Sequence, residues 1–84
     1  MPKINRFNIT EHLLNVQLKM VNKTMFECMQ NPDWFHEWTM TTEQHEKFKA
    51  YAIPLLKKTF KFNTNKAKST FDWFNLQYGL RIQD

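Results

Sequence analysis

Apolar residues recur at helical spacing along most of the chain and predict long helices. The first such segment begins at a capping box, in which Asn8 is the N-cap and Glu11 lies three residues further on. Because the apolar residues that follow recur every three or four positions, the pattern predicts one helix over about Asn8–Met29. Its apolar stripe consists of Leu14, Leu18, Val21, Met25, Cys28 and Met29.

Two further helix starts follow this segment. The triplet Asn31-Pro32-Asp33 combines a good N-cap with a proline suited to the first helical position, and predicts a short helix over Pro32–Trp38. Thr41 and Gln44 form a second capping box, which predicts a helix over Thr42–Phe60. We expect the apolar half of that helix to contain Phe48, Tyr51, Ala52, Leu55, Leu56 and Phe60.

The last helix is expected to begin near Thr64 or Asn65 and to end at Tyr78. Gly79 suits the left-handed position that follows a helix in a Schellman stop, with an apolar residue after it. Residues 80–82 then predict a short extended tail over the domain. One side of this helix carries the apolar stripe, and the other side carries Trp73 and Leu76; the stripe consists of Ala67, Phe71, Phe74 and Tyr78.

These elements predict an all-α fold, a small bundle of three main helices and one short helix in a single domain over residues 1–84. A single glycine argues against a fold rich in β-hairpins, whose turns need glycine. A single cysteine excludes a disulfide framework within the chain. We recognise neither a signal peptide nor an apolar run of membrane-spanning length, and therefore expect a cytoplasmic protein that does not enter a membrane.

No residue pattern predicts an enzyme, and we expect no catalytic residue, no cofactor and no metal. One glycine cannot supply a phosphate-binding loop. Cys28 falls on the apolar stripe of the first helix, where we interpret it as a small core residue rather than a nucleophile. The four residues that could bind zinc lack the spacing of a zinc site; they are His12, Cys28, His36 and His45.

Lysines are concentrated in the second half of the chain, which has a net charge of +4. Seven lysines and no acidic residue lie between Lys47 and Phe71. Such a surface attracts nucleic acid or an acidic protein, and it can equally be a solvated face. Arginine is scarce, so nucleic-acid binding would rest on phosphates rather than on base-specific contacts. The residues that we assign to this binding are Lys57, Lys58, Lys61, Lys66 and Lys68.

Aromatic residues supply a second candidate surface. Trp34, Phe35 and Trp38 lie within about one helical turn of one another, and Trp73 and Leu76 lie opposite the stripe of the last helix. Tryptophan is enriched at binding hot spots, so these five residues form a candidate site for a protein partner. The alternative is that the tryptophans pack on the core. Self-association into a homodimer is a further alternative, because a helix that is apolar on two sides can complete its core with a second copy.

The segments NPDWFxxW (Asn31 to Trp38) and WFNLQYGLR (Trp73 to Arg81) resemble small accessory proteins of T4-like tailed bacteriophages. This resemblance implies a protein that binds a host or defence-system macromolecule in the host cytoplasm without catalysis. The hypothesis from the sequence is therefore a non-enzymatic, phage-encoded protein that modulates a host or bacterial protein. The alternative hypothesis is sequence-tolerant RNA or DNA binding through the lysines.

Overall fold

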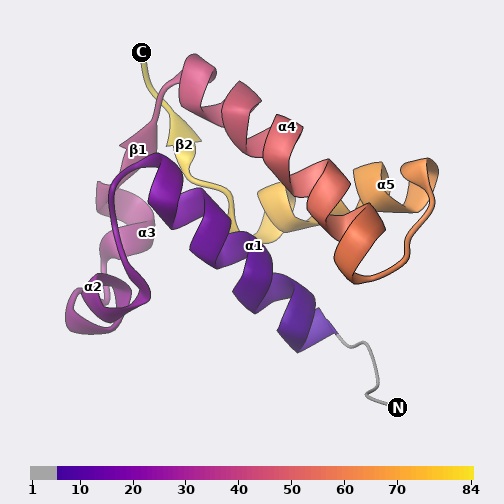
Figure 1. Cartoon of the computed structure of the whole chain (residues 1–84). Helices are drawn as coiled ribbons and strands as arrows, with labels where there is room; N and C mark the ends of the chain where they lie inside the picture. Colours follow the sequence, from indigo (N-terminus) through magenta and orange to yellow (C-terminus); the bar gives the residue numbers. More distant parts are fainter. Residues whose placement is uncertain (1–5) are drawn as a thin grey trace.

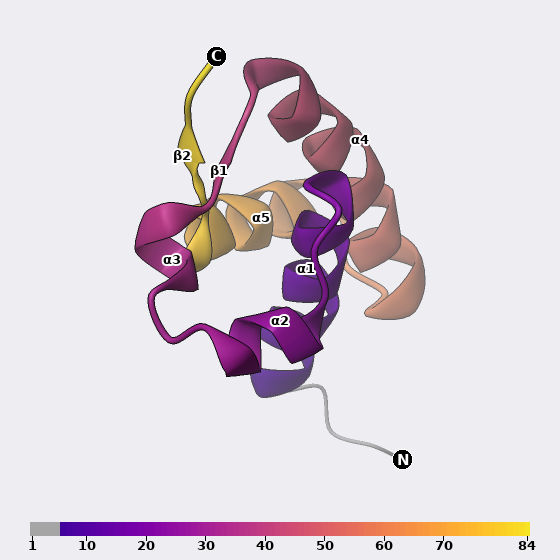
Figure 2. The ribbon, with the colours of Figure 1, turned by 90° about the vertical axis from the view of Figure 1, so that its left-hand side faces the viewer.

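The computed structural model describes residues 6–84, with side chains from Asn8 onward, and confirms the all-α fold. Two long helices, α1 (Arg6–Met20) and α4 (Thr42–Thr59), lie side by side and antiparallel, and α5 (Thr64–Tyr78) packs against both (Figure 1). Two short helices, α2 (Met25–Gln30) and α3 (Trp34–Glu37), lie at one end of the bundle (Figure 2). Two short strands, β1 (Thr39–Met40) and β2 (Arg81–Ile82), complete the described part of the chain.

The single helix predicted over Asn8–Met29 is wrong, because the chain turns between α1 and α2. Asn22 adopts the left-handed conformation with φ of 59°. The Lys23 N–H donates to the Leu18 carbonyl at 2.8 Å, and the Asn22 N–H donates to the Lys19 carbonyl at 3.2 Å. These two bonds form a Schellman stop, in which asparagine replaces the usual glycine.

The starts of the first three helices also differ from the expectation. The segment α1 begins at Arg6, so Asn8 lies inside the helix and is not its N-cap. Thr24 and Glu27 form a capping box that begins α2 and was not recognised in the sequence. The segment α3 begins only at Trp34, because the Asn31 side-chain oxygen accepts from the Asp33 N–H at 3.1 Å and holds residues 31–33 in a turn.

The predicted capping box at the start of α4 is confirmed. The Thr41 hydroxyl accepts from the Gln44 N–H, and the Gln44 side chain accepts from the Thr41 N–H at 2.8 Å. The Gln44 amide group also donates to the Met20 carbonyl at 3.0 Å, where α1 ends. One side chain therefore satisfies an N–H group at the start of one helix and a carbonyl group at the end of another.

The end of α5 is correct at Tyr78, but Gly79 does not adopt the predicted left-handed conformation. Its φ is −67° and its ψ is 139°, which is extended backbone open to any residue. The position still requires glycine, because a Cβ there would lie 2.5 Å from the Asn75 carbonyl oxygen. Close approach of two backbone segments, rather than a positive φ, explains this glycine.

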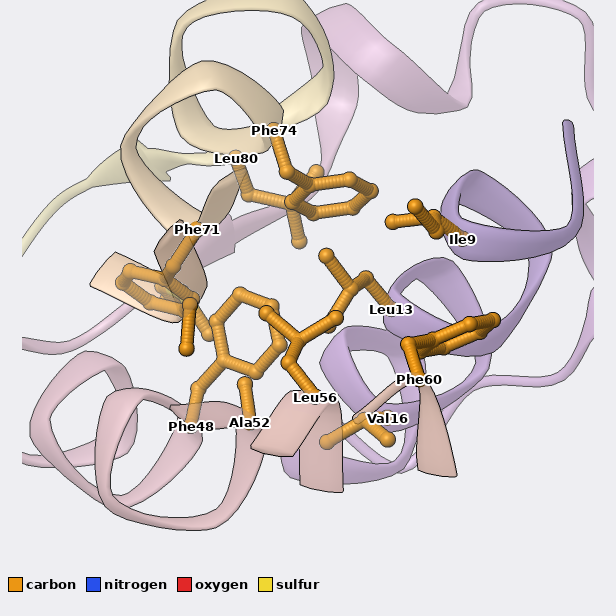
Figure 3. Packing of buried hydrophobic residues seen from close by; sticks show 12 residues of the cluster. Ile9, Leu13, Val16, Phe48, Ala52, Leu56, Phe60, Phe71, Phe74 and Leu80 are labelled. Carbon is orange, nitrogen blue, oxygen red and sulfur yellow. The ribbon is translucent and has the colours of Figure 1, made fainter. Parts of the chain in front are cut away.

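The hydrophobic core lies between α1, α4 and α5 (Figure 3). Phe48 of α4 is in ring contact with Phe71 and Phe74 of α5, at centroid distances of 4.9 and 5.8 Å. Leu13 of α1 and Leu56 of α4 point toward the same centre and are fully buried. Phe48, Leu56, Phe71 and Phe74 are among the residues that the helical periodicity of the last two helices predicts to be inside.

One polar side chain, Gln17 of α1, is fully buried with a relative exposure of 0%. Its amide nitrogen donates to the Tyr78 carbonyl at 3.1 Å, and its amide oxygen accepts from the Leu80 N–H at 3.1 Å. The Tyr78 carbonyl is one of the last carbonyls of α5, which lack partners within the helix, and the Leu80 N–H lies just past the helix end. The Gln17 amide therefore closes the end of α5 against α1.

Residues 79–84, which we call the C-terminal strap, run beside β1 (Figure 2). The strands β1 and β2 pair in parallel, with Thr39 opposite Arg81. The Arg81 guanidinium donates to the His36 carbonyl at 3.0 Å. The Asp84 carboxylate accepts from the Thr42 N–H at 2.8 Å and from its hydroxyl at 2.7 Å. The tail predicted as extended is therefore paired with β1 and held against the start of α4.

Replacing Gln17 with leucine tests the amide contact. The Gln17→Leu variant keeps a side chain of similar size but leaves the buried Leu80 N–H without its acceptor. We expect the free energy of unfolding to fall by about 1–3 kcal/mol, measured by urea denaturation. Gln77→Leu is the matched control, because Gln77 is exposed on α5, and it should change stability by less than about 0.5 kcal/mol. Equal stability of the two variants would show that the amide contributes nothing.

The contact between Asp84 and Thr42 predicts a pH dependence of stability. Hydrogen bonds from the Thr42 N–H and then from its hydroxyl lower the pKa of Asp84 below its usual value. A lowered pKa in the folded state stabilises the fold above the ordinary carboxyl pKa, and this contribution is lost as the pH falls below about 4. Between pH 6 and pH 3 we expect the Tm of the wild type to fall further than that of Asp84→Asn. Asp72→Asn, another exposed carboxylate, should behave like the wild type.

Candidate functional site

The predicted aromatic site on α3 is largely part of the scaffold. Trp34 and Trp38 are half-buried and pack against the hydrophobic core. The Trp34 ring lies 5.4 Å from the ring of Phe35 and 5.9 Å from that of Trp38. The Lys23 ammonium group lies 5.0 Å from the Trp38 ring centroid. These contacts support the interpretation that the tryptophans cover the core where α3 meets the bundle.

Trp73 and Leu76 occupy the side of α5 that faces away from Phe71 and Phe74. Trp73 is half-buried, packs against the core, and lies 6.2 Å from the Tyr78 ring. Leu76 has a relative exposure of 82%. Of the apolar residues predicted to bind a partner, Leu76 is the one with a largely exposed side chain. We call Trp73 and Leu76 together the α5 outer face.

The five lysines assigned from the sequence are all exposed, and they lie around the connection between α4 and α5 (Figure 1). Within residues 8–84 an ion pair joins Lys47 to Glu43 at 3.4 Å, and none involves these five lysines. The Lys66 ammonium group lies 4.6 Å above the Phe62 ring, which is half-buried. We call this set the lysine corner: Lys57, Lys58, Lys61, Lys66 and Lys68.

The structure distributes the predicted residues over separate elements. The aromatic residues of α3 lie at the end of the bundle that carries β1, whereas the lysine corner lies at the end where α4 meets α5 (Figure 1). The α5 outer face lies on the same helix as Lys66 and Lys68. A protein partner on α5 would therefore find lysines on the same helix, and the α3 aromatic residues remain a separate cluster.

Two parts of the surface depart from the sequence prediction. Tyr51, expected in the apolar half of α4, has a relative exposure of 57%. Met29, expected in the apolar stripe of the first helix, has a relative exposure of 80%, because the turn at Asn22 takes α2 out of line with α1. The exposure of Tyr51 could have been predicted from its spacing. It lies four residues after Lys47 and seven before Lys58, which places it on the same side of the helix as these lysines.

Metal binding and thiol chemistry depend on how the His, Cys, Asp and Glu side chains of the described residues are placed. Within residues 8–84, no three His, Cys, Asp or Glu side chains come close enough together to hold a metal ion. Cys28 is buried, and burial, followed by the nearby Glu27 carboxylate, raises the pKa of its thiol. A raised pKa lowers the fraction of reactive thiolate. Among the described helices, none is both long enough and apolar enough to cross a membrane.

Comparisons of this chain with family models, with curated proteins and with solved structures find no match. The surfaces themselves therefore carry the functional argument. They are the α5 outer face, where a large apolar side chain is exposed, and the lysine corner with the neighbouring part of α4.

Alanine variants of the α5 outer face separate packing from surface exposure. Trp73→Ala should lower the free energy of unfolding by about 1–3 kcal/mol, because the half-buried ring packs on the core. Leu76→Ala should change it by less than about 0.5 kcal/mol, because that side chain is exposed. Urea denaturation measures both values. If the Trp73→Ala variant were as stable as the wild type, the Trp73 ring would not contribute to the stability of the fold and would be assigned to an interface.

Proposed function

We propose that the protein is a non-enzymatic binding protein that takes a protein partner on the α5 outer face. The observation that carries this proposal is the exposure of Leu76, which is the highest among the large apolar side chains within residues 8–84. Trp73 lies less than one helical turn before it and is half-buried. Tryptophan is enriched at the centres of protein interfaces, so Trp73 next to an exposed apolar side chain supports an interface on this face.

The charges around this face suit a partner that carries acidic groups. Lys66 and Lys68 lie on the first turns of the same helix and are exposed. Asp72 is the acidic residue of the helix and lies beside Leu76 on the exposed side. With a net charge of +4, the chain attracts an acidic partner at long range. The lysines would then guide the encounter, and the apolar contact would hold the complex.

The resemblance to small accessory proteins of T4-like phages adds a class of partner to this proposal. A phage-encoded protein of this kind would bind a host or defence-system protein in the host cytoplasm and modulate it. The resemblance of the segments around Trp34 and Trp73 is the support for this part of the proposal, and it stays a prediction.

Capture from a bacterial lysate tests the proposed interface. The tagged wild-type chain should retain a discrete protein after nuclease treatment. Leu76→Asp should weaken that retention at least about tenfold, because a charge in an apolar contact has no partner. Since Leu76 is exposed, the variant should keep the helix content of the wild type.

Met29→Asp is the matched control, because Met29 is an equally exposed apolar side chain on α2. The control should retain the partner as the wild type does. Equal loss in both variants would show non-specific apolar capture. Unchanged retention by Leu76→Asp would exclude the α5 outer face as the interface.

A further inference from the structure

The outward side of α4 carries a line of residues at helical spacing. Lys47, Tyr51, Pro54 and Lys58 follow one another at intervals of four, three and four residues, and all four are exposed. We call this line the α4 outer face. At 1.5 Å per residue, the line from Lys47 to Lys58 is about 17 Å long. Lys61 is also exposed and lies just past the end of α4 at Thr59. It is independent of the α5 outer face, whose residues belong to a different helix.

The α4 outer face is positively charged over most of its length. No acidic residue occurs between Lys47 and Phe71 in the sequence. At the start of the line, Lys47 is paired with Glu43 at 3.4 Å. Within residues 8–84, Lys58 and Lys61 have no ion pair. An anionic ligand would therefore meet two lysines, Lys58 and Lys61, that are not paired with a carboxylate of the described residues.

Tyr51 places an aromatic ring in the middle of these lysines. Its relative exposure of 57% means that the core does not use most of the side chain. In the part of the chain with described side chains, no other ring lies against it. Its exposed neighbours on the helix surface include Ala50 and Pro54, which are small. A flat ligand can therefore approach the ring.

We propose that the α4 outer face binds single-stranded nucleic acid, with phosphates on the lysines and one base stacked on Tyr51. Proteins that bind single strands without sequence preference combine a cationic track with aromatic rings on which bases stack. In a duplex the faces of the bases are covered by their neighbours, so a single stacking ring favours a single strand. Because the face carries lysines and no arginine, binding should be tolerant of sequence.

Two oligonucleotides of equal charge separate stacking from charge attraction. The full chain is titrated into fluorescently labelled oligo-dT of twelve nucleotides and, separately, into an abasic strand of the same length, with anisotropy as the readout. The wild type should bind oligo-dT on the order of tenfold more tightly than the abasic strand. Tyr51→Ala should bind both strands equally, at the affinity of the wild type for the abasic strand.

Further variants identify which group acts. Tyr51→Phe keeps the ring and should keep the preference for oligo-dT. Lys58→Gln should weaken binding to both strands and reduce the slope of log K against log salt concentration by about 0.7. Lys19→Gln, an exposed lysine on α1, should leave both affinities unchanged. Leu76→Asp should bind oligo-dT like the wild type, so that failure of the protein interface and failure of this proposal are distinguishable.

Three results would overturn the proposal. Equal affinity of the wild type and Tyr51→Ala for oligo-dT would remove the stacking contact. Tighter binding to a duplex than to oligo-dT, with no effect of Tyr51→Ala, would assign the face to double-stranded nucleic acid. Binding of a polyglutamate peptide as tightly as oligo-dT, with the same dependence on Lys58, would assign the face to acidic proteins.

Discussion

The buried amide of Gln17 determines how α1 and the end of α5 meet. A primary amide has both a donor and an acceptor, and here both are used on backbone groups where α5 ends, Tyr78 and Leu80. These groups are more than sixty residues away in sequence. A fully buried amide without partners would destabilise the fold, so α1 and the end of α5 must lie in one relative position. The hydrophobic contacts alone are less directional and would permit several positions.

The position of the C-terminal strap follows from this contact. Once the Leu80 N–H is bonded to Gln17, the next residues run along β1 and reach the start of α4. There the Asp84 carboxylate accepts from the Thr42 N–H, one of the N–H groups that a helix leaves without an internal partner. Gln44 connects the same end of α4 to the end of α1. The inner faces of the long helices are thereby buried in the core, and the outer faces of α4 and α5 remain on the surface.

Elements whose start and stop signals are local could be predicted from the sequence. The helix α4 and its Thr41–Gln44 capping box depend on residues within one turn, and the prediction is confirmed. The division between α1 and α2 also has local signals, which are Asn22 and the capping box at Thr24. The prediction of one helix followed the continuous apolar stripe instead of these signals. Features that depend on distant residues could not be read in this way. They are the burial of Gln17, the pairing of β1 with β2, and the reason for Gly79.

The candidate surfaces show the same limit. Leu76 was placed outside by periodicity and is exposed, because its position lies directly opposite the core stripe. Tyr51 and Trp73 lie at the borders of their helix faces, where a small difference in packing decides between core and solvent. Periodicity placed Tyr51 inside and Trp73 equally in the core or an interface. The structure shows that the first is mostly exposed and that the second packs on the core.

The stability of the fold explains some of the lysines but not all of them. Lys57 and Lys58 lie in the last turn of α4, where positive charge is favourable to the helix dipole. Lys66 gains a contact with the Phe62 ring. Lys61 has φ of 60°, a conformation that glycine or asparagine adopts at lower cost. A lysine at this position lowers stability by about 1 kcal/mol relative to glycine, and it adds a positive charge just past the C-terminal end of the α4 outer face. Binding of an anionic ligand on that face gives this lysine a role that the fold alone does not.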